Sequence, residues 1–117
     1  MIPGKKQLLV LAFGLLTVCG CKHSPSKPVR VLTAKEAAGQ RVFANQCSGC
    51  HYADTDKGLY GPGLAGLFSK PYLTSGMAAN DGRVRAVILR GWGMMPPMGN
   101  TLSDQDLEDL MAYLHTL

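Results

Sequence analysis

The chain has 117 residues, which allows a single domain, and its 12 basic and 8 acidic residues give a formal net charge of +4. Five of the basic residues precede residue 33, so residues 33–117 contain 7 basic against 8 acidic residues and carry about −1. Basic and aromatic residues are not interleaved in the sequence, so the composition does not support binding to nucleic acid, and no nucleic-acid partner is expected.

The first 20 residues predict an export signal. Two lysines precede an apolar stretch from Leu8 to Val18, which is too short to span a bilayer and matches the core of a signal peptide. The stretch ends in Val18-Cys19-Gly20-Cys21, which resembles the cleavage box of bacterial lipoproteins. We therefore expect Cys21 to carry a lipid that anchors the exported protein to the periplasmic side of a membrane. An ordinary secretory cleavage nearby is the main alternative.

From Lys22 to Leu32 the chain is rich in serine, proline and lysine and has no apolar period, which predicts a semi-extended tether. Fully stretched, this segment reaches roughly 40 Å at about 3.3 Å per residue. The predicted organisation is a lipoprotein-type signal peptide over residues 1–20, the lipidated cysteine and tether over 21–33, and a folded domain over 34–117.

A first helix is predicted from Ala34 to Gln46. The preceding Thr33 and the following Glu36 match a capping box, in which each side chain pairs with the backbone amide of the other residue. Gly39 and Phe43 stand four residues apart on one helix face. A glycine inside a helix costs about 1 kcal/mol relative to alanine, so we expect a second helix to approach closely at Gly39.

The last helix is the expected partner. Residues 103–106, Ser-Asp-Gln-Asp, resemble a second capping box and place acidic side chains at the positive end of the helix dipole. Apolar residues then follow at i, i+3, i+4 and i+7, namely Leu107, Leu110, Met111 and Leu114. The two ends of the domain are therefore expected to cross.

Between these helices the sequence predicts a short helix from Gly82 to Arg90, capped by Asn80 or Asp81, and a further turn over residues 64–68. No run alternates apolar and polar residues, and glycine and proline crowd residues 58–66 and 91–99. The pattern favours an all-α domain with long loops. Such a domain has a small core, and domains of this size usually need a disulfide, a metal or a cofactor.

Residues 47–51, Cys-Ser-Gly-Cys-His, are the strongest motif in the chain. A CxxCH sequence is typical of c-type haem attachment, in which Cys47 and Cys50 form thioethers to the haem and His51 ligates its iron. A dithiol redox pair, half of a zinc site and a disulfide are the alternatives. The βαβ setting of a redox pair is absent, and the remaining histidines, His23 and His115, lie far from the motif in sequence.

A sixth iron ligand is expected from residues 91–98, a glycine and proline loop that contains Met94, Met95 and Met98. Methionines commonly fill gaps in a core, which is the alternative role for these side chains. Three methionines within five residues of a constrained loop are hard to explain by packing alone, so we expect one of them to supply a thioether ligand.

These pieces resemble the class I monohaem cytochrome c family over nearly all of residues 34–117. The matching segments are Gly39 with Phe43, CSGCH at 47–51, GPGLAGLF at 61–68, MPP at 95–97 and LSDQDLEDLMAYL at 102–114. The resemblance implies an all-α, cytochrome c-like fold of three to four short helices with long loops around one covalently bound haem c.

The same resemblance implies roles for individual residues. Met95, directly before the proline, is the expected sixth ligand, with Met98 as the alternative. The backbone carbonyl of Pro62 is expected to accept a hydrogen bond from the ring of His51 and so orient it. Tyr113 is the expected aromatic partner of Gly39 and Phe43, and Leu110 and Leu114 are expected in the core.

Ligation by histidine and methionine leaves no iron position for oxygen or peroxide, so the sequence predicts an electron carrier rather than an enzyme, with no small-molecule substrate. Its exposed haem edge is expected to dock briefly against redox partner proteins. Two alternatives remain open. One is a haem subunit of a larger respiratory oxidase, reductase or dehydrogenase, and the other is a sensor in which a labile methionine gives way to a small ligand.

Overall fold

A computed structural model describes residues 30–117. Its elements are α1 (Ala34–Gln46), the 3-10 helix η1 (Leu67–Ser69), α2 (Asp81–Arg90) and α3 (Asp104–Leu114). These residues form no strand, and their β-type pairing is limited to two isolated bridges. The domain is therefore all-α, as predicted. The predicted signal peptide, the lipidation site Cys21 and the tether up to residue 29 lie outside the described residues.

Helix α1 begins and ends at the residues that its sequence predicts. The Thr33 hydroxyl accepts from the Glu36 amide at 3.2 Å, and the Glu36 carboxylate accepts from the Thr33 amide at 2.8 Å. The second of these hydrogen bonds, from the Thr33 backbone, holds the pKa of Glu36 below its usual value. The capping box thus satisfies two amides that the first turn of a helix leaves without partners.

Helix α3 starts in the same way. The Ser103 hydroxyl accepts from the Asp106 amide at 3.1 Å, and the Asp106 carboxylate accepts from both the hydroxyl and the amide of Ser103. These hydrogen bonds, the hydroxyl's first, keep the pKa of Asp106 below its usual value. In both α1 and α3, the residue that caps the start of the helix pairs with the residue three positions later, so each start is set by local sequence.

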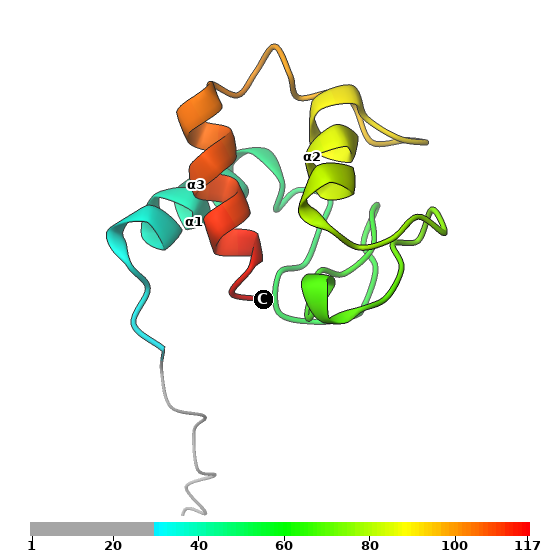
Figure 1. Ribbon diagram of the computed structural model, residues 1–117, viewed down its shortest axis with the longest axis horizontal. Coiled ribbons are helices and arrows are strands. Elements are labelled where there is room, and N and C mark those ends of the chain that lie inside the picture. The colour runs from blue at the N-terminus through cyan, green and yellow to red at the C-terminus, as the bar shows by residue number, and fades with distance from the viewer. Residues whose placement is uncertain (1–29) are drawn as a thin grey trace, which may run out of the picture.

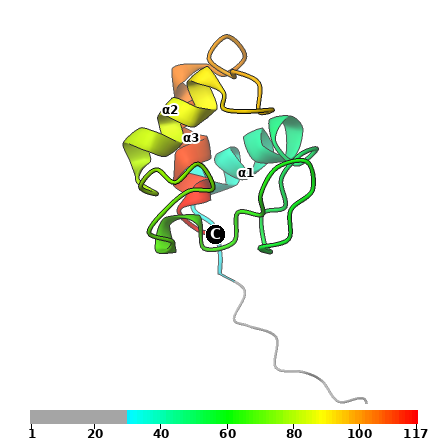
Figure 2. The same ribbon diagram turned by 90° about the vertical axis from the view of Figure 1, so that its right-hand side faces the viewer.

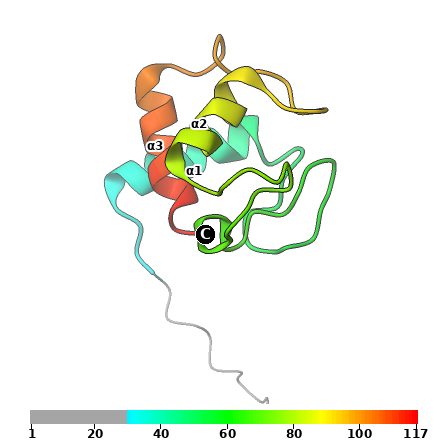
Figure 3. The ribbon, with the colours of Figure 1, turned by 45° about the vertical axis from the view of Figure 1, so that its right-hand side comes forward.

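Helices α1 and α3 cross (Figures 1 and 3), and Gly39 of α1 lies against the backbone of α3. A β-carbon at Gly39 would lie 1.8 Å from the carbonyl oxygen of Asp109 and 2.8 Å from the β-carbon of Tyr113, so only glycine fits. One turn later the rings of Phe43 and Tyr113 pack at a tilt of 54° with their centroids 5.6 Å apart. The helical glycine is thus explained by the close approach of α3.

Helix α2 begins at Asp81, one residue before the expected start, because Asn80 supplies the cap by accepting from the Arg83 amide at 3.0 Å. It ends at Gly91, whose φ of 74° is in the left-handed region. The expected turn over residues 64–68 is instead the 3-10 helix at Leu67–Ser69, which follows Gly66 in a left-handed conformation.

Figure 2 shows α3 between α2 and α1, and in Figure 1 the loops over residues 52–80 and 91–103 lie at opposite ends of α2. The core is a single cluster built mainly from these three helices. Its buried members are Phe43, Leu67, Val84, Ile88, Leu107, Leu110, Met111, Tyr113 and Leu114. Within residues 30–117 the core is small for the loops that it must hold, which agrees with the expected need for a cofactor.

The substitution Gly39→Ala tests the helix crossing. It should lower the free energy of unfolding by about 1–3 kcal/mol, because the added β-carbon displaces backbone of α3. The measurement is denaturant unfolding followed by circular dichroism. The matched control is Gly82→Ala in α2, where a β-carbon meets only the Asn80 side chain at 3.6 Å and stability should hold or rise by up to about 1 kcal/mol. Unchanged stability of Gly39→Ala would contradict the close approach.

Candidate functional site

A cavity of about 520 Å³ lies between the end of α1, the loop over residues 60–75, α2 and the loop after α2. Its volume is in the range of pockets that hold organic ligands and cofactors. Its walls are mostly apolar, with side chains from all three α-helices, namely Phe43, Val84, Val87, Ile88, Leu110 and Leu114. The residues of highest chemical interest in the sequence line the same cavity.

The CSGCH motif forms the turn that leaves α1. Cys47 is the C-cap residue, and its carbonyl accepts from the amides of both Cys50 and His51 at 3.0 Å. This turn places Cys47, Cys50 and His51 together on the cavity wall. Cys50 is exposed and Cys47 is half-buried. Burial, together with the neighbouring Cys50, raises the pKa of the Cys47 thiol to about 11.

The ring of His51 is held by the segment that follows it. His51 Nδ1 donates to the carbonyl oxygen of Pro62 at 2.8 Å. This hydrogen bond uses one ring nitrogen, so the other, Nε2, is the one that can ligate a metal. The residue before the proline must be glycine, because a β-carbon at Gly61 would lie 2.3 Å from Cε1 of the imidazole. Gly63 is equally constrained, since its β-carbon would meet the Thr55 carbonyl oxygen at 2.1 Å. The family resemblance predicts the hydrogen bond to the Pro62 carbonyl, whereas no local pattern in the sequence indicates the steric role of Gly61 and Gly63.

The methionine loop approaches the cavity from the end of α2. Trp92 and Met95 exchange two backbone hydrogen bonds, of 3.2 and 3.0 Å, around a tight turn that contains Gly93 with φ of 59°. Met94, at the tip of the turn, is 90% exposed, whereas Met95 is half-buried against the core and lines the cavity. Met98 packs against the core and is not among the lining residues.

Exposed aromatic and apolar side chains surround the cavity. Tyr60, Tyr72, Trp92 and Met94 all contribute to its lining and are between 52% and 90% exposed. Lys70 also lines the cavity and pairs with Asp56 at 2.5 Å. Exposed apolar residues gathered in one place on a soluble domain mark a binding surface. Tyr72 was not singled out by its sequence, because its neighbours form no motif.

The donor set fits haem c. Two thiols and an imidazole nitrogen lie on one part of the wall and a thioether on another, and this combination is the one that c-type haem uses. Within residues 30–117 no group of three or more histidine, cysteine or acidic side chains has the arrangement of a metal site. The apolar walls suit a large apolar cofactor far better than a hydrated ion.

Comparison with known proteins also indicates a cytochrome. The chain is 30% identical over 112 residues to cytochrome c6 of Picosynechococcus sp., covering 93% of this chain and 92% of that protein. It is 33% identical over 87 residues to cytochrome c-554(547) of Halothiobacillus neapolitanus, covering 69% of this chain and 94% of the relative. It is also 29% identical over 100 residues to the Cbb3-type cytochrome c oxidase subunit FixPc of Rhizobium leguminosarum bv. viciae, covering 86% of this chain but 32% of that subunit.

The family model for cytochrome c matches residues 36–117. This range includes every residue that lines the cavity and the whole of α3 with its capping box. It begins at Glu36, in the first turn of α1. Relatives that match over most of their own length are cytochromes. The all-α fold, the apolar cavity and the CSGCH turn agree with this match. The chain therefore belongs to the cytochrome c family, holds a covalently bound haem c and functions in haem-based electron transfer.

Proposed function

We propose that the protein is an exported, membrane-tethered electron carrier in which Cys47 and Cys50 attach one haem and His51 and Met95 ligate its iron. The observation that carries the proposal is the cavity itself. All four residues line it, although Met95 follows α2 and the others follow α1. Among the three loop methionines, Met98 is absent from the lining and Met94 is largely exposed, which favours Met95.

The bound haem supplies one-electron chemistry. The chain's own residues hold the ligands in place: Pro62 accepts from His51 Nδ1, which fixes the ring orientation and raises the basicity of Nε2. Met95 contributes a neutral thioether, which favours the reduced state and raises the midpoint potential relative to a second histidine. With His51 and Met95 both held as ligands, the bound haem would serve electron transfer, and the protein would act as a carrier without a small-molecule substrate rather than as an enzyme.

Redox partners are proposed to dock around the cavity opening. Tyr60, Tyr72, Trp92 and Met94 present apolar surface there, and electron-transfer complexes use contacts that are small and weak. A subunit role in a larger respiratory complex is the second candidate, and the likeness to an oxidase subunit favours it. Co-purification of a second subunit from detergent-solubilised membranes would decide for that role.

Membrane attachment is proposed to depend on Cys21. The apolar stretch that precedes this residue and the lipoprotein-like box that contains it support lipidation after export. Within residues 30–117 no helix has the length and hydropathy needed to cross a membrane. The proline-rich and serine-rich tether then allows the haem domain to reach partners at a distance from the bilayer.

The double variant Cys47→Ser, Cys50→Ser tests haem attachment. It should accumulate as an unfolded or degraded chain, because the cofactor supplies apolar contact that the small core lacks. Far-ultraviolet circular dichroism and a covalent-haem stain of the exported protein are the measurements. Ser48→Ala, within the same turn, is the matched control and should retain haem and fold. A folded, haem-free double variant would contradict the proposal.

The variant Met95→Leu tests iron ligation. It should lose the weak absorption band of the iron to methionine bond, lower the midpoint potential and gain carbon monoxide binding in the reduced state. Met98→Leu is the control, and it should keep the band and remain closed to carbon monoxide. If Met98→Leu loses the band instead, Met98 is the ligand. Carbon monoxide binding by the unmodified protein would favour the small-ligand sensor.

The variant Cys21→Ser tests the anchor. We expect the unmodified precursor to yield a membrane-bound protein, and the serine variant to yield soluble periplasmic haem protein with an unchanged visible spectrum. Cell fractionation followed by a haem stain, with mass spectrometry of the mature N-terminus, is the measurement. Cys19→Ser is the matched control and should stay on the membrane. Membrane retention of Cys21→Ser would rule out lipidation at this cysteine.

A further inference from the structure

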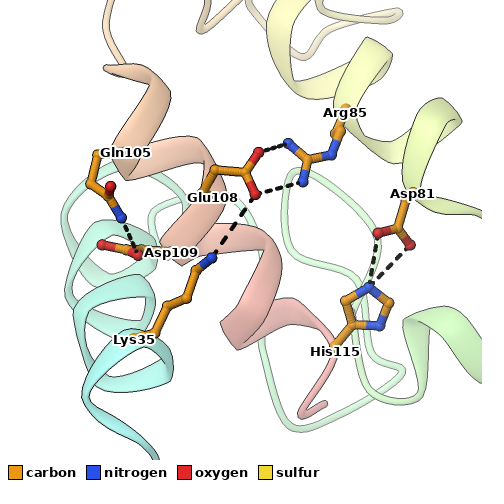
Figure 4. A network of polar contacts seen from close by, with 7 residues as sticks. All are labelled: Lys35, Asp81, Arg85, Gln105, Glu108, Asp109 and His115. Carbon is orange, nitrogen blue, oxygen red and sulfur yellow. Dashed lines mark hydrogen bonds and ion pairs between the residues drawn. The ribbon is translucent and has the colours of Figure 1, made fainter.

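Glu108 of α3 contacts both other helices (Figure 4). Its two carboxylate oxygens accept from Nη1 and Nη2 of Arg85 in α2, at 2.5 and 3.1 Å. The ammonium of Lys35 in α1 lies 4.0 Å from the same carboxylate. The side chains of Arg85 and Glu108 are 29% and 48% exposed, so water partly screens the charges of this bidentate pair. The hydrogen bonds from Arg85 lower the pKa of Glu108, and those to Glu108 raise the pKa of Arg85.

A second pair joins the same two helices. His115, the residue that caps the C-terminus of α3, donates from Nε2 to the carboxylate of Asp81 at 3.0 and 3.2 Å (Figure 4). Its ring also stacks on Phe68 of η1, with the centroids 3.9 Å apart and the planes 13° from parallel. Asp81 and Arg85 are one turn apart on α2, so two polar contacts with α3 hold the helix at two points: the Asp81–His115 hydrogen bonds and the Arg85–Glu108 ion pair.

The loop that contains Met95 is attached to the far end of α2. The amides of Met98 and Gly99 donate to the carbonyl oxygens of Ile88 and Leu89, at 2.9 and 3.2 Å. The carbonyl oxygen of Met95 packs so closely on Gly91 that a β-carbon there would lie 2.4 Å from it. The loop is therefore fixed to α2 on both sides of the methionine, and a shift of α2 moves Met95 with it.

The apolar contacts of α2 are less specific in direction than its two polar contacts with α3. Val84, Val87 and Ile88 line the cavity, so part of the apolar surface of α2 faces the cavity rather than α3. Hydrophobic contact is non-directional and tolerates sliding of one surface over another. A bidentate guanidinium and carboxylate pair has a fixed geometry. The Arg85–Glu108 pair thus adds a contact of fixed direction to the apolar packing of Val84 and Ile88 in the core.

We propose that Arg85 and Glu108, supported by Asp81 and His115, are positioning residues that hold Met95 at the iron by fixing α2 against α3. The proposal rests on the proposed ligation by Met95. Neither Arg85 nor Glu108 lines the cavity, so both act through the backbone of α2 and the loop that follows it. Loss of the pair should loosen the methionine side of the haem and leave the His51 side, which α1 carries, unchanged.

A double-mutant cycle on the holoprotein tests this proposal. The variants are Arg85→Gln, Glu108→Gln and the two combined, with Asp109→Asn as the matched control. Asp109 is also on α3, but its carboxylate accepts from Gln105 of the same helix and has no contact with α2 in Figure 4. Imidazole binding to the oxidised protein reports how readily the sixth ligand is displaced. Amide hydrogen exchange at residues 98 and 99 reports the attachment of the loop to α2.

Both single variants should bind imidazole about two- to fivefold more tightly and exchange the two loop amides faster by a similar factor, the range that one exposed pair supports. The combined variant should match the single ones, because either change removes the Arg85–Glu108 pair, and the exposed Lys35 ammonium at 4.0 Å from Glu108 adds little. Amides of α1 should exchange at unchanged rates, as should all amides of Asp109→Asn.

Additive effects in the combined variant, or equal acceleration of exchange in α1, would overturn the proposal, because the pair would then contribute only general stability. Unchanged loop exchange in all variants would overturn it as well. Met95→Leu separates this result from a failed ligand assignment. If the loop amides accelerate in Arg85→Gln while imidazole affinity responds to neither Arg85→Gln nor Met95→Leu, the positioning of the loop holds and Met95 is not the ligand.

Discussion

The backbones of α1 and α3 meet at Gly39, where no side chain larger than hydrogen fits beside the Asp109 carbonyl oxygen. This contact determines where α1 ends relative to α3. The CSGCH turn begins at the C-cap of α1, so the crossing also places Cys47, Cys50 and His51 on the wall of the cavity that Leu110 and Leu114 line. A single close approach between backbones therefore connects the packing of the terminal helices to the chemistry of the site.

The two proposed iron ligands are held by different parts of the domain. His51 follows α1 directly, and the segment Gly61-Pro62-Gly63 closes around its ring. Met95 belongs to a loop that hydrogen bonds to the end of α2, and α2 reaches the α1–α3 pair through ion pairs as well as through the core. The histidine side of the cavity is consequently part of the rigid crossing, while the methionine side depends on a partly exposed polar contact.

Local signals explain what the sequence predicts well. The starts of α1 and α3 follow from cap residues three positions apart, and the CSGCH turn is read from five consecutive residues. Other features depend on neighbours distant in sequence. The glycine at 61 is required by a ring ten positions earlier, and Arg85 pairs with a residue 23 positions later. The residues alone leave three methionines as candidates for the sixth ligand, and the family resemblance favours Met95 over Met98. The fold adds an independent reason for the proposed assignment, since Met95 lines the cavity and Met98 does not.

This division bears on how one fold serves two functions. A carrier needs the same ligands in both redox states, whereas a sensor needs one ligand that leaves when a small molecule arrives. His51 is held by the turn after α1, so under the proposed ligation a change between these behaviours would come from the methionine side. The energy involved is small, since a few kcal/mol shifts a two-state equilibrium almost completely. The polar contacts between α2 and α3 lie outside the cavity lining. Under this proposal, a family member with the same cavity could therefore differ in ligand affinity through these contacts, without any change in its haem-binding motif.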